Sequence, residues 1–352
     1  MHLPKIRDYL SIYKYNNKVG IGDTPNRALE ISDPEGIFYK FVKLCDGTRT
    51  KEEIFLELNN KNISFEELIE WLDVLSNEGY ILEDELDNQK FMSDSKNERH
   101  LRNINFLSNF SADSKNKFDY IEKIQKQNVL LLGLGGVGSV ILYNLAALGV
   151  EKITGVDFDT VDTTNLNRQI LYGEKDIGRK KTESSEKTIS DFNSDITYKT
   201  LDIKIESYDQ LENIIQENDF DFIFCAADTP PFLLYQWVDE ISENYNIPWM
   251  YGGTREAISS YSLIVPNKTY SYRKSFRAHL EKSNGEALEK YNYVKENKPK
   301  YANNCIAASS SILSSFMIFD FIKYVTGMEQ TLSNDSIIYF DYRNMEFNEV
   351  KI

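Results

Sequence analysis

A glycine-rich turn in the middle of the chain places the strongest constraint on its fold. The segment LLLGLGGVGSVILYNLAALGV, residues 130–150, joins an aliphatic run to an amphipathic stretch through Gly133, Gly135, Gly136 and Gly138. A strand that turns through such glycines into a helix can bring backbone N–H groups and the helix N-terminus against a phosphate. The turn predicts a nucleotide site, and it is compatible with either a dinucleotide or ATP.

The segments after residue 127 alternate between apolar runs typical of buried strands and patterns typical of helices. The expected strands are NVLLLG, KITGVDFD, TYKTLDIKI, FDFIFCAAD and IPWMYGG, and helices are expected after Gly138, around YDQLENIIQEN and in FLLYQWVDEISENY. Near-continuous apolar strands between helices indicate a parallel sheet covered on both faces. The final segments SIIYFDY and EFNEVKI predict a hairpin at the sheet edge. We therefore predict an α/β fold with a Rossmann-like, mostly parallel sheet.

The N-terminal residues 1–92 have the pattern of a separate small domain. GIFYKFVKLCDGTRTKEEIFLELNN predicts a helix, a turn at Gly47 and a second helix capped by Thr48 or Thr50, with Glu53 placed for a capping box. SFEELIEWLDVLSNEGYILED predicts a third helix that begins after Ser64, followed by a short strand. Three helices and a small β-wing predict a winged-helix-like domain.

Composition limits the classes of function. The chain has 352 residues and a formal net charge of −15, which argues against nucleic-acid binding because a phosphate backbone requires a basic face. The most apolar long segment, which starts at Cys305, is interrupted by five serines, Asp320 and Lys323, so it reads as a buried helix rather than a membrane span. Three scattered cysteines and three scattered histidines predict neither disulfides nor structural zinc. We expect a cytoplasmic protein that binds no membrane.

The loop after the second expected strand distinguishes ATP from NAD. Asp157 lies about 20 residues beyond the glycines, where a carboxylate can accept ribose hydroxyls. The loop DFDTVDTTNLNRQILYGEKDIGRKKTESS then supplies Asp159, Asn165, Arg168, Gln169 and Lys181. Two cations and an amide suit a triphosphate, whereas a dehydrogenase needs an apolar slot for nicotinamide. NAD-dependent redox chemistry is therefore the last of the alternatives.

Asp228 stands at the end of the expected strand FDFIFCA, at the edge where open α/β sheets bind ligands. A carboxylate there can hold Mg²⁺ against phosphate oxygens. The same residue can also cap the helix in FLLYQW, and both roles can hold together.

The string GLGGVGS…GVDFDTVDTTNLNRQ…IGRKK…CAADTPP resembles the ThiF/MoeB superfamily of adenylyltransferases, which includes the ubiquitin-activating enzymes. The resemblance implies that residues 93–352 form an adenylation domain, with a linker and helical arm over 93–125 and a charged crossover loop over 273–304. The resemblance implies that Asp157 binds the ribose, that Asp159 lies near the nucleotide and that Lys181 binds phosphate. Asn165, Arg168 and Gln169 match the family's NLxRQ signature, and Asp228 matches its magnesium-associated aspartate.

The family's RYxRQ start is similar to RHLRN here, which implies that Arg102 reaches the ATP of a partner subunit and that the chain is a homodimer. Asn103 stands where the family has glutamine.

Two further resemblances concern the substrate. LCDGTRTKEEI followed by GYILED is similar to PqqD-like domains, in which a precursor peptide adds to the β-wing as an extra strand. An adenylation domain without CxxC pairs or a crossover cysteine, behind such a domain, resembles the microcin C-type peptide adenylyltransferases. Cys225 and Cys305 are expected to be core residues rather than thiolates.

The microcin C-type resemblance implies a nucleotidyltransferase that uses ATP or CTP and Mg²⁺, without zinc. Its substrate would be a short ribosomal precursor peptide with a terminal asparagine, and the reaction would pass through a succinimide to a phosphoramidate. Two alternatives remain. The protein could activate a sulfur carrier or ubiquitin-like protein that ends in Gly-Gly, or it could be a non-catalytic scaffold for a precursor peptide. The peptide's identity and the choice between ATP and CTP stay open.

Overall fold

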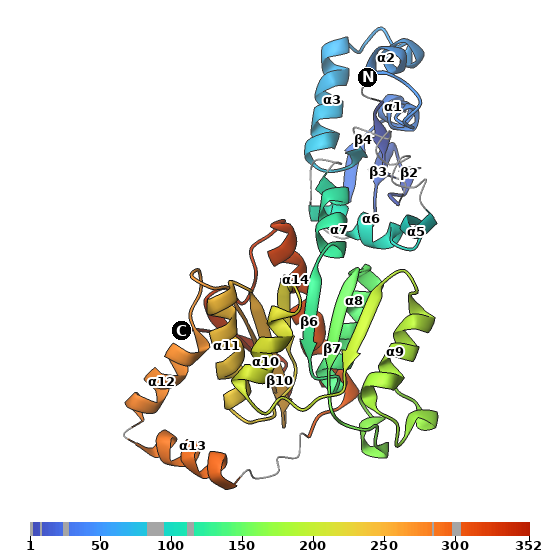
Figure 1. The fold of residues 1–352 in the computed structure, drawn as a ribbon. Helices are drawn as coiled ribbons and strands as arrows, with labels where there is room; N and C mark the ends of the chain where they lie inside the picture. Colours follow the sequence, from blue (N-terminus) through green and yellow to red (C-terminus); the bar gives the residue numbers. More distant parts are fainter. Residues whose placement is uncertain are drawn as a thin grey trace. The chain divides into compact units, whose positions relative to one another are not determined.

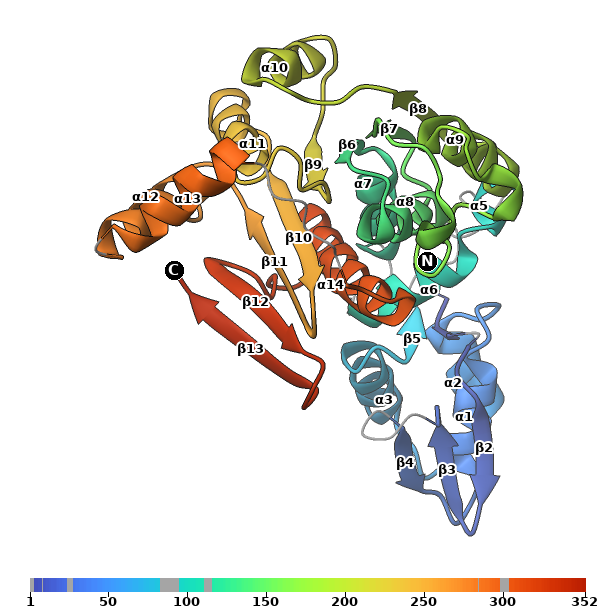
Figure 2. The ribbon, with the colours of Figure 1, turned by 90° about the horizontal axis from the view of Figure 1, so that it is seen from below.

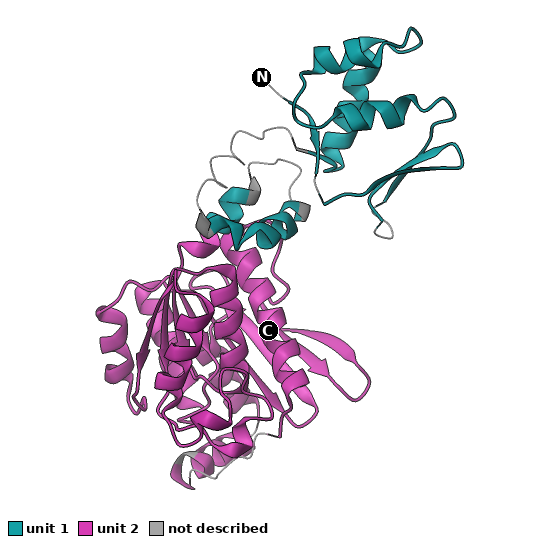
Figure 3. Cartoon of the chain, turned by 90° about the vertical axis from the view of Figure 1, so that its right-hand side faces the viewer, with its two compact units in different colours: residues 1–122 teal, residues 123–352 magenta. Residues whose placement is uncertain are grey.

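The computed structural model describes residues 3–7, 9–23, 28–82, 95–110, 116–283, 285–297 and 304–352. The chain forms two compact units, residues 1–122 and residues 123–352, shown in teal and magenta in Figure 3. The predicted domain boundary between residues 92 and 93 lies outside the described residues.

The first unit combines short strands with a bundle of helices. Its elements are β1 (Lys5–Ile6), β2 (Ile12–Tyr15), β3 (Lys18–Ile21), β4 (Leu29–Ser32), α1 (Ile37–Leu44), α2 (Lys51–Leu58), α3 (Phe65–Asn77), β5 (Ile81–Leu82), α5 (Ser95–Glu98), α6 (Leu101–Leu107) and α7 (Asn116–Gln125), which extends past the unit boundary. Strands β2, β3 and β4 form an antiparallel sheet in that order, while β1 pairs with β5. The three predicted helices are present, whereas the β2–β4 sheet is a feature that the sequence pattern did not predict.

Local sequence signals fix two of these helices. The Thr50 hydroxyl accepts from Glu53 N at 3.2 Å and the Glu53 carboxylate accepts from Thr50 N at 2.8 Å, which confirms the predicted capping box. Ser64 and Glu67 make the same reciprocal pair at the start of α3. Each pair satisfies two N–H groups that a helix start would leave without partners.

The second unit is built on an eight-stranded sheet, of which β6, β7 and β10 are labelled in Figure 1. Its strand order, β13-β12-β11-β10-β9-β6-β7-β8, can be followed in Figure 2. Its strands are β6 (Asn128–Leu132), β7 (Lys152–Val156), β8 (Thr197–Leu201), β9 (Phe222–Cys225), β10 (Trp249–Arg255), β11 (Ile258–Ile264), β12 (Ser336–Asp341) and β13 (Glu346–Lys351). Strands β6 to β10 are parallel and β11 to β13 continue antiparallel. The predicted α/β class, the mostly parallel sheet and the C-terminal hairpin at its edge, seen in Figure 2, are confirmed.

Helices cover both faces of this sheet. They are α8 (Gly136–Leu148), α9 (Lys181–Phe192), α10 (Tyr208–Gln216), α11 (Leu233–Tyr245), α12 (Tyr272–Lys282), α13 (Glu286–Asn297) and α14 (Ala307–Thr326), with 3₁₀ turns at Thr163–Asn165 and Glu174–Asp176. Residues alternate between the faces: Ile223 and Cys225 join the core under α10 and α11, whereas Phe222 and Phe224 lie against Phe321 of α14. The buried helix expected from Cys305 onward is therefore α14.

The segment expected as a crossover loop, residues 273–304, contains most of α12 and all of α13. Residues 298–303 lie outside the described residues. None of the helices in the described ranges has the length and apolarity that crossing a membrane requires.

Candidate nucleotide-binding site

The glycine turn between β6 and α8 is held tightly against the neighbouring strand end. Gly133 has φ +92°, and a Cβ there would lie 2.9 Å from the carbonyl oxygen of Ala226. A Cβ at Gly138 would lie 1.9 Å from the carbonyl oxygen of Gly133. Only residues without side chains allow this close return of the backbone. Gly138 thus allows the backbone of the turn to pack against itself, whereas Gly133, Gly135 and Gly136 line the cavity.

A cavity of about 710 Å³ opens at the carboxyl ends of the parallel strands. The strand order reverses between β6 and β9, which is the switch point where open α/β sheets bind ligands. Nine of the twelve predicted site residues line it: Gly133, Gly135, Gly136, Asp157, Asp159, Arg168, Gln169, Lys181 and Asp228. The structure therefore brings together residues that span almost a hundred positions of the chain.

Lys181 and two aspartates form the polar floor of the cavity. Lys181 Nζ lies 2.7 Å from Asp159 Oδ2 and 3.8 Å from Asp157 Oδ2, and Lys181 and Asp157 are both buried. The Asp157 carboxylate accepts from Leu134 N at 2.7 Å and from Asp159 N at 2.9 Å. These bonds fix Asp157 beside the glycine turn. Lys181 keeps further N–H donors for a ligand, because an ammonium group carries three.

Arg168 and Gln169 are carried on a turn that Asn165 shapes. The Asn165 carbonyl accepts from Arg168 N at 3.1 Å and from Gln169 N at 3.0 Å, and its side chain accepts from Asp162 N. Arg168 Nη1 donates to Thr164 O at 2.9 Å and to Asn167 Oδ1 at 2.8 Å. Asn165 acts on the loop and does not line the cavity itself.

Two buried polar atoms on the cavity wall have no hydrogen-bond partner among the described residues: Gln169 Oε1 and Ser310 Oγ. Buried polar groups are nearly always paired, so such atoms mark where a ligand would bind. The Ser310 hydroxyl can donate to a phosphate oxygen, and Gln169 Oε1 can accept from a ribose hydroxyl or a base amino group. Together with the backbone cradle at Gly133, they fit a nucleotide.

Asp228 is exposed at the end of β9 and lines the same cavity. Among the described residues, no group of three or more His, Cys, Asp or Glu side chains is arranged to hold a metal ion. Mg²⁺ commonly takes one or two carboxylates and completes its shell with water and phosphate oxygens. Asp228 therefore fits a magnesium ion that arrives with a nucleotide, rather than a metal held by protein alone.

An aromatic wall on the far side of the cavity was not predicted from the sequence. Tyr235, Tyr251 and Tyr272 line it, with ring centroids 5.2 Å apart for Tyr235 and Tyr251 and 5.4 Å for Tyr251 and Tyr272. Burial raises the pKa of Tyr235 and Tyr251 well above 10, so both remain neutral. Phe232 also lines the cavity and packs against Phe276 and Tyr291 of the crossover helices. No motif links these residues, because they lie on three separate elements.

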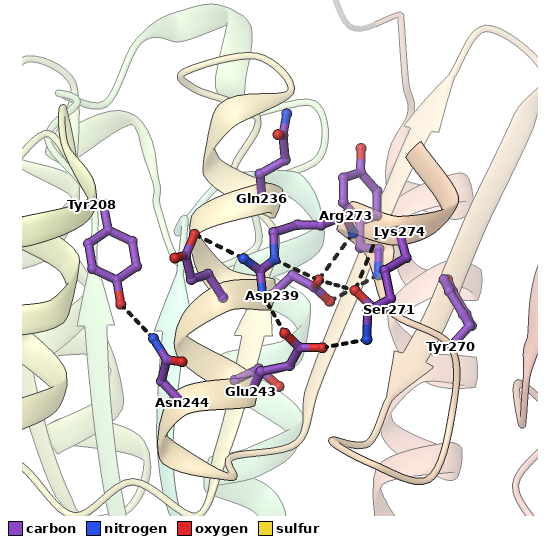
Figure 4. A network of polar contacts seen from close by, with 12 residues as sticks. Tyr208, Gln236, Asp239, Glu243, Asn244, Tyr270, Ser271, Arg273 and Lys274 are labelled. Atoms are coloured by element: carbon purple, nitrogen blue, oxygen red, sulfur yellow. Dashed lines mark hydrogen bonds and ion pairs between the residues drawn. The ribbon is translucent and has the colours of Figure 1, made fainter. Parts of the chain in front are cut away.

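A buried carboxylate fixes the start of α12, and with it Tyr272. Asp239 of α11 accepts from Ser271 Oγ at 2.7 Å, Tyr272 N at 3.0 Å and Arg273 N at 3.1 Å (Figure 4). Arg273 also pairs with Glu240 and Glu243, and Lys274 pairs with Glu243. We call this set the Asp239 network. It attaches the crossover to α11 beside the cavity.

The cysteines differ in environment. Cys225 is buried within β9, and burial raises the pKa of its thiol to about 12. Cys305 is half-buried and lines the cavity just before α14, so it is not the core residue that the sequence suggested.

Arg102 is exposed on α6 and belongs to the first unit, so the structure does not test its predicted contact with ATP.

Comparison with known proteins identifies the family of the chain. The model of the ThiF family matches residues 100–352, most of the chain. The chain belongs to the ThiF family. A curated relative of this ThiF-family chain, the ubiquitin-activating enzyme E1-like protein of Saccharomyces cerevisiae, is 32% identical over 155 residues. That match covers 43% of this chain and 23% of the yeast protein, so the chain spans only a minor part of that relative's length.

Two solved structures share the fold of the ThiF-family chain over its whole length. E. coli MccB with ATP gives a TM-score of 0.77 at 22% identity, covering 100% of this chain and 96% of that one. The microcin C7 biosynthetic enzyme MccB in complex with N-formylated MccA gives 0.78 at 21% identity, covering 100% and 97%. At such identities the likeness concerns the fold.

Proposed function

We propose that this protein is a nucleotidyltransferase that activates the C-terminus of a short ribosomal precursor peptide with ATP or CTP. The observation that carries the proposal is the meeting of a glycine turn, Arg168, Lys181 and Asp228 in one cavity. These groups can position the nucleotide and neutralise the charge on its phosphates, which are the main requirements of nucleotidyl transfer.

The proposed first step joins a carboxylate to the nucleotide. A carboxylate oxygen of the peptide attacks the α-phosphorus, a new O–P bond forms, and the bond to pyrophosphate breaks. The product is an acyl-nucleotide whose leaving group is the nucleoside monophosphate, and pyrophosphate carries away the bonding electron pair. In the finer proposal, the amide nitrogen of a terminal asparagine then attacks the activated carbonyl, which closes a succinimide and releases the nucleoside monophosphate and a proton. The succinimide nitrogen attacks the α-phosphorus of a second nucleotide with loss of its proton and of pyrophosphate, and water opens the ring to give the phosphoramidate.

Residue roles follow from position in the cavity. Asp157 would accept the ribose hydroxyls, Arg168 and Lys181 would hold phosphate oxygens, and Asp228 would hold Mg²⁺, which neutralises charge on the phosphates when bound. The half-buried Tyr235 and the buried Tyr251 would exclude water from one side of the site, which protects an activated acyl group from hydrolysis.

A groove in the first unit supports a peptide as the partner. It has a volume of about 380 Å³ and is lined by Ile31 of β4, an edge strand of the β2–β4 sheet, and by Trp71 and Val74 of α3. An edge strand offers unpaired backbone groups to an extended peptide, and an adjoining apolar groove can take alternate side chains. MccB crystallised with N-formylated MccA is a related case.

We also propose that the protein acts in the cytoplasm as a homodimer in which Arg102 completes the site of the partner subunit. Mixing an Arg102→Ala chain with a Lys181→Met chain tests this, because only a site completed by the partner regains activity in the mixed dimer. Failure of the mixture to recover activity would count against action in trans.

The main experiment measures pyrophosphate release from ATP and from CTP with candidate peptides encoded beside the gene. We expect release with a short peptide that ends in Asn, and loss of release in Asp228→Ala. Release driven instead by a small protein ending in Gly-Gly would favour carrier activation. Nucleotide binding without turnover for any candidate would favour a scaffold.

A further inference from the structure

The N-termini of two helices lie at the cavity. One is that of α8, which follows the glycine turn, and the other is that of α14. Helix α14 begins at Ala307 after its N-cap Ile306, and Cys305 and Ser310 line the cavity beside it. The Ser314 hydroxyl donates to Val137 O at 3.0 Å, which ties α14 to the first turn of α8. Each helix N-terminus carries about half a positive charge. Two such ends side by side favour an anion between them.

Ser310 differs from Ser309, Ser314 and Ser315 of the same helix. The hydroxyls of Ser309, Ser314 and Ser315 donate to backbone carbonyls at 3.0, 3.0 and 2.7 Å. Ser310 Oγ is fully buried and has no partner among the described residues. Its backbone N–H makes the first helical bond, to Ile306 O at 3.2 Å, so the preceding N–H groups of α14 stand ahead of the helical ladder. An unpaired hydroxyl therefore lines the cavity, one turn after the N-terminus of α14.

The position of Ser310 indicates which part of a ligand it meets. A Cβ at Gly136 would lie 2.9 Å from Ser310 Oγ and 3.3 Å from the Cγ and Cδ atoms of Arg168. The Ser310 hydroxyl and the Arg168 stem thus both stand over the first residue of α8, where a helix binds phosphate. Asn167 Nδ2 donates to Cys305 O at 3.5 Å, which joins the Arg168 loop to the start of α14.

We propose that Ser310 and the N-terminus of α14 bind a phosphate group of the nucleotide, together with the N-terminus of α8. The inference rests on the proposed function and adds to it a second helix that holds the same phosphate. A substrate carboxylate offers similar oxygens, but the place of Ser310 over the glycine turn favours the phosphate.

The test compares Ser310→Ala with Ser314→Ala in the full-length protein. Both hydroxyls are buried on α14, but only Ser310 lines the cavity. Titration calorimetry with ATP, CTP and inorganic tripolyphosphate should show about tenfold weaker binding for Ser310→Ala, the loss expected for one hydrogen bond to a charged group. Ser314→Ala should bind each ligand as the wild type does.

Melting without ligand separates a binding role from a structural one. Ser310→Ala should melt no lower than the wild type, because it removes an unpaired buried hydroxyl. Ser314→Ala should melt lower, because it removes the hydrogen bond from Ser314 to Val137 O that joins α14 to α8. A lower melting temperature for Ser310→Ala would overturn the inference by assigning Ser310 a structural role.

The binding outcomes are equally decisive. Wild-type affinity for ATP, CTP and tripolyphosphate in Ser310→Ala would overturn this inference and leave the proposed function standing. A raised peptide KM with unchanged nucleotide affinity would overturn it in favour of the substrate carboxylate. A wild-type protein that binds none of the three ligands would overturn the proposed function and this inference with it.

Discussion

Gly138→Ala tests whether the glycine turn depends on close backbone packing. The added Cβ would stand 1.9 Å from the carbonyl oxygen of Gly133, and contacts below 3.0 Å essentially do not occur. The start of α8 must therefore move by more than an ångström away from β6. Gly133 N donates to Val156 O at 2.8 Å, and this bond lies within the part that moves.

The magnitude follows from overpacking and strained hydrogen bonds. Overpacking costs about 1–3 kcal/mol and each disturbed backbone bond about 1 kcal/mol, so we expect the free energy of unfolding to fall by about 3 kcal/mol. For a unit the size of residues 123–352, this corresponds to a melting temperature lower by about 6–12 °C. Scanning calorimetry of the full-length protein measures it.

Gly135→Ala is the matched control, because the nearest atom to its Cβ would be Gln169 Nε2 at 3.9 Å and its φ of −79° suits alanine. We expect its melting temperature to stay within about 4 °C of the wild type, since an alanine N-cap costs about 1 kcal/mol. The new methyl faces the cavity, so nucleotide affinity should fall instead. Melting of Gly138→Ala within 2 °C of the wild type would refute the packing argument.

Three further predictions concern charge and burial. Lys181→Met should lower the rate of pyrophosphate release about 100-fold to 1,000-fold, because one preorganised donor to phosphate is lost; a rate within tenfold of the wild type would count against its role. Burial raises the pKa of the Cys225 thiol to about 12 and that of Tyr235 well above 10. As pH rises, both groups therefore lose their protons at a lower pH in the unfolded chain than in the folded one. Stability should hold below pH 9 and fall as pH rises from 9 toward 12, and melting curves that stay flat across this range would contradict it. Asp239→Ala should lower the free energy of unfolding by about 3 kcal/mol, because it removes the buried acceptor of three partly buried donors. Glu240→Gln should cost less than about 1 kcal/mol, because its pair with Arg273 is partly exposed, and equal effects of the two substitutions in calorimetry would be contrary evidence.

The parts of the site that the sequence predicted are those held in contiguous motifs. Asp157 and Lys181 stand at the two ends of one polar segment that follows one strand, and the charges of that segment together with the family resemblance indicated that both face the nucleotide. Thr50 and Glu53 form a bond across three residues, which a local pattern can specify.

The remainder depends on contacts between distant segments. Ser310 and Tyr272 reach the cavity only because α14 and α12 fold back on the sheet, and neither has a recognisable motif. The charged pattern of residues 273–304 indicated a loop, because weak helical periodicity there conceals α12 and α13. The start of α12 is fixed by Asp239, which lies 34 residues before Arg273 in the chain, so no local sequence signal could reveal where this helix begins.

The Asp239 network has a consequence for how substrate preference can change. The fixed point of the crossover lies on α11, and it holds Tyr272 at the cavity before the rest of α12 and α13 begins. Beyond Lys274, Phe276 and Tyr291 still pack against Phe232 of the cavity wall. The other residues of the crossover can therefore vary while the wall stays in place. The crossover is therefore a segment that can be exchanged between related proteins while its attachment to Asp239 is kept. A chimaera that takes a relative's crossover from the residue after Lys274 would change substrate preference without changing the nucleotide-binding residues.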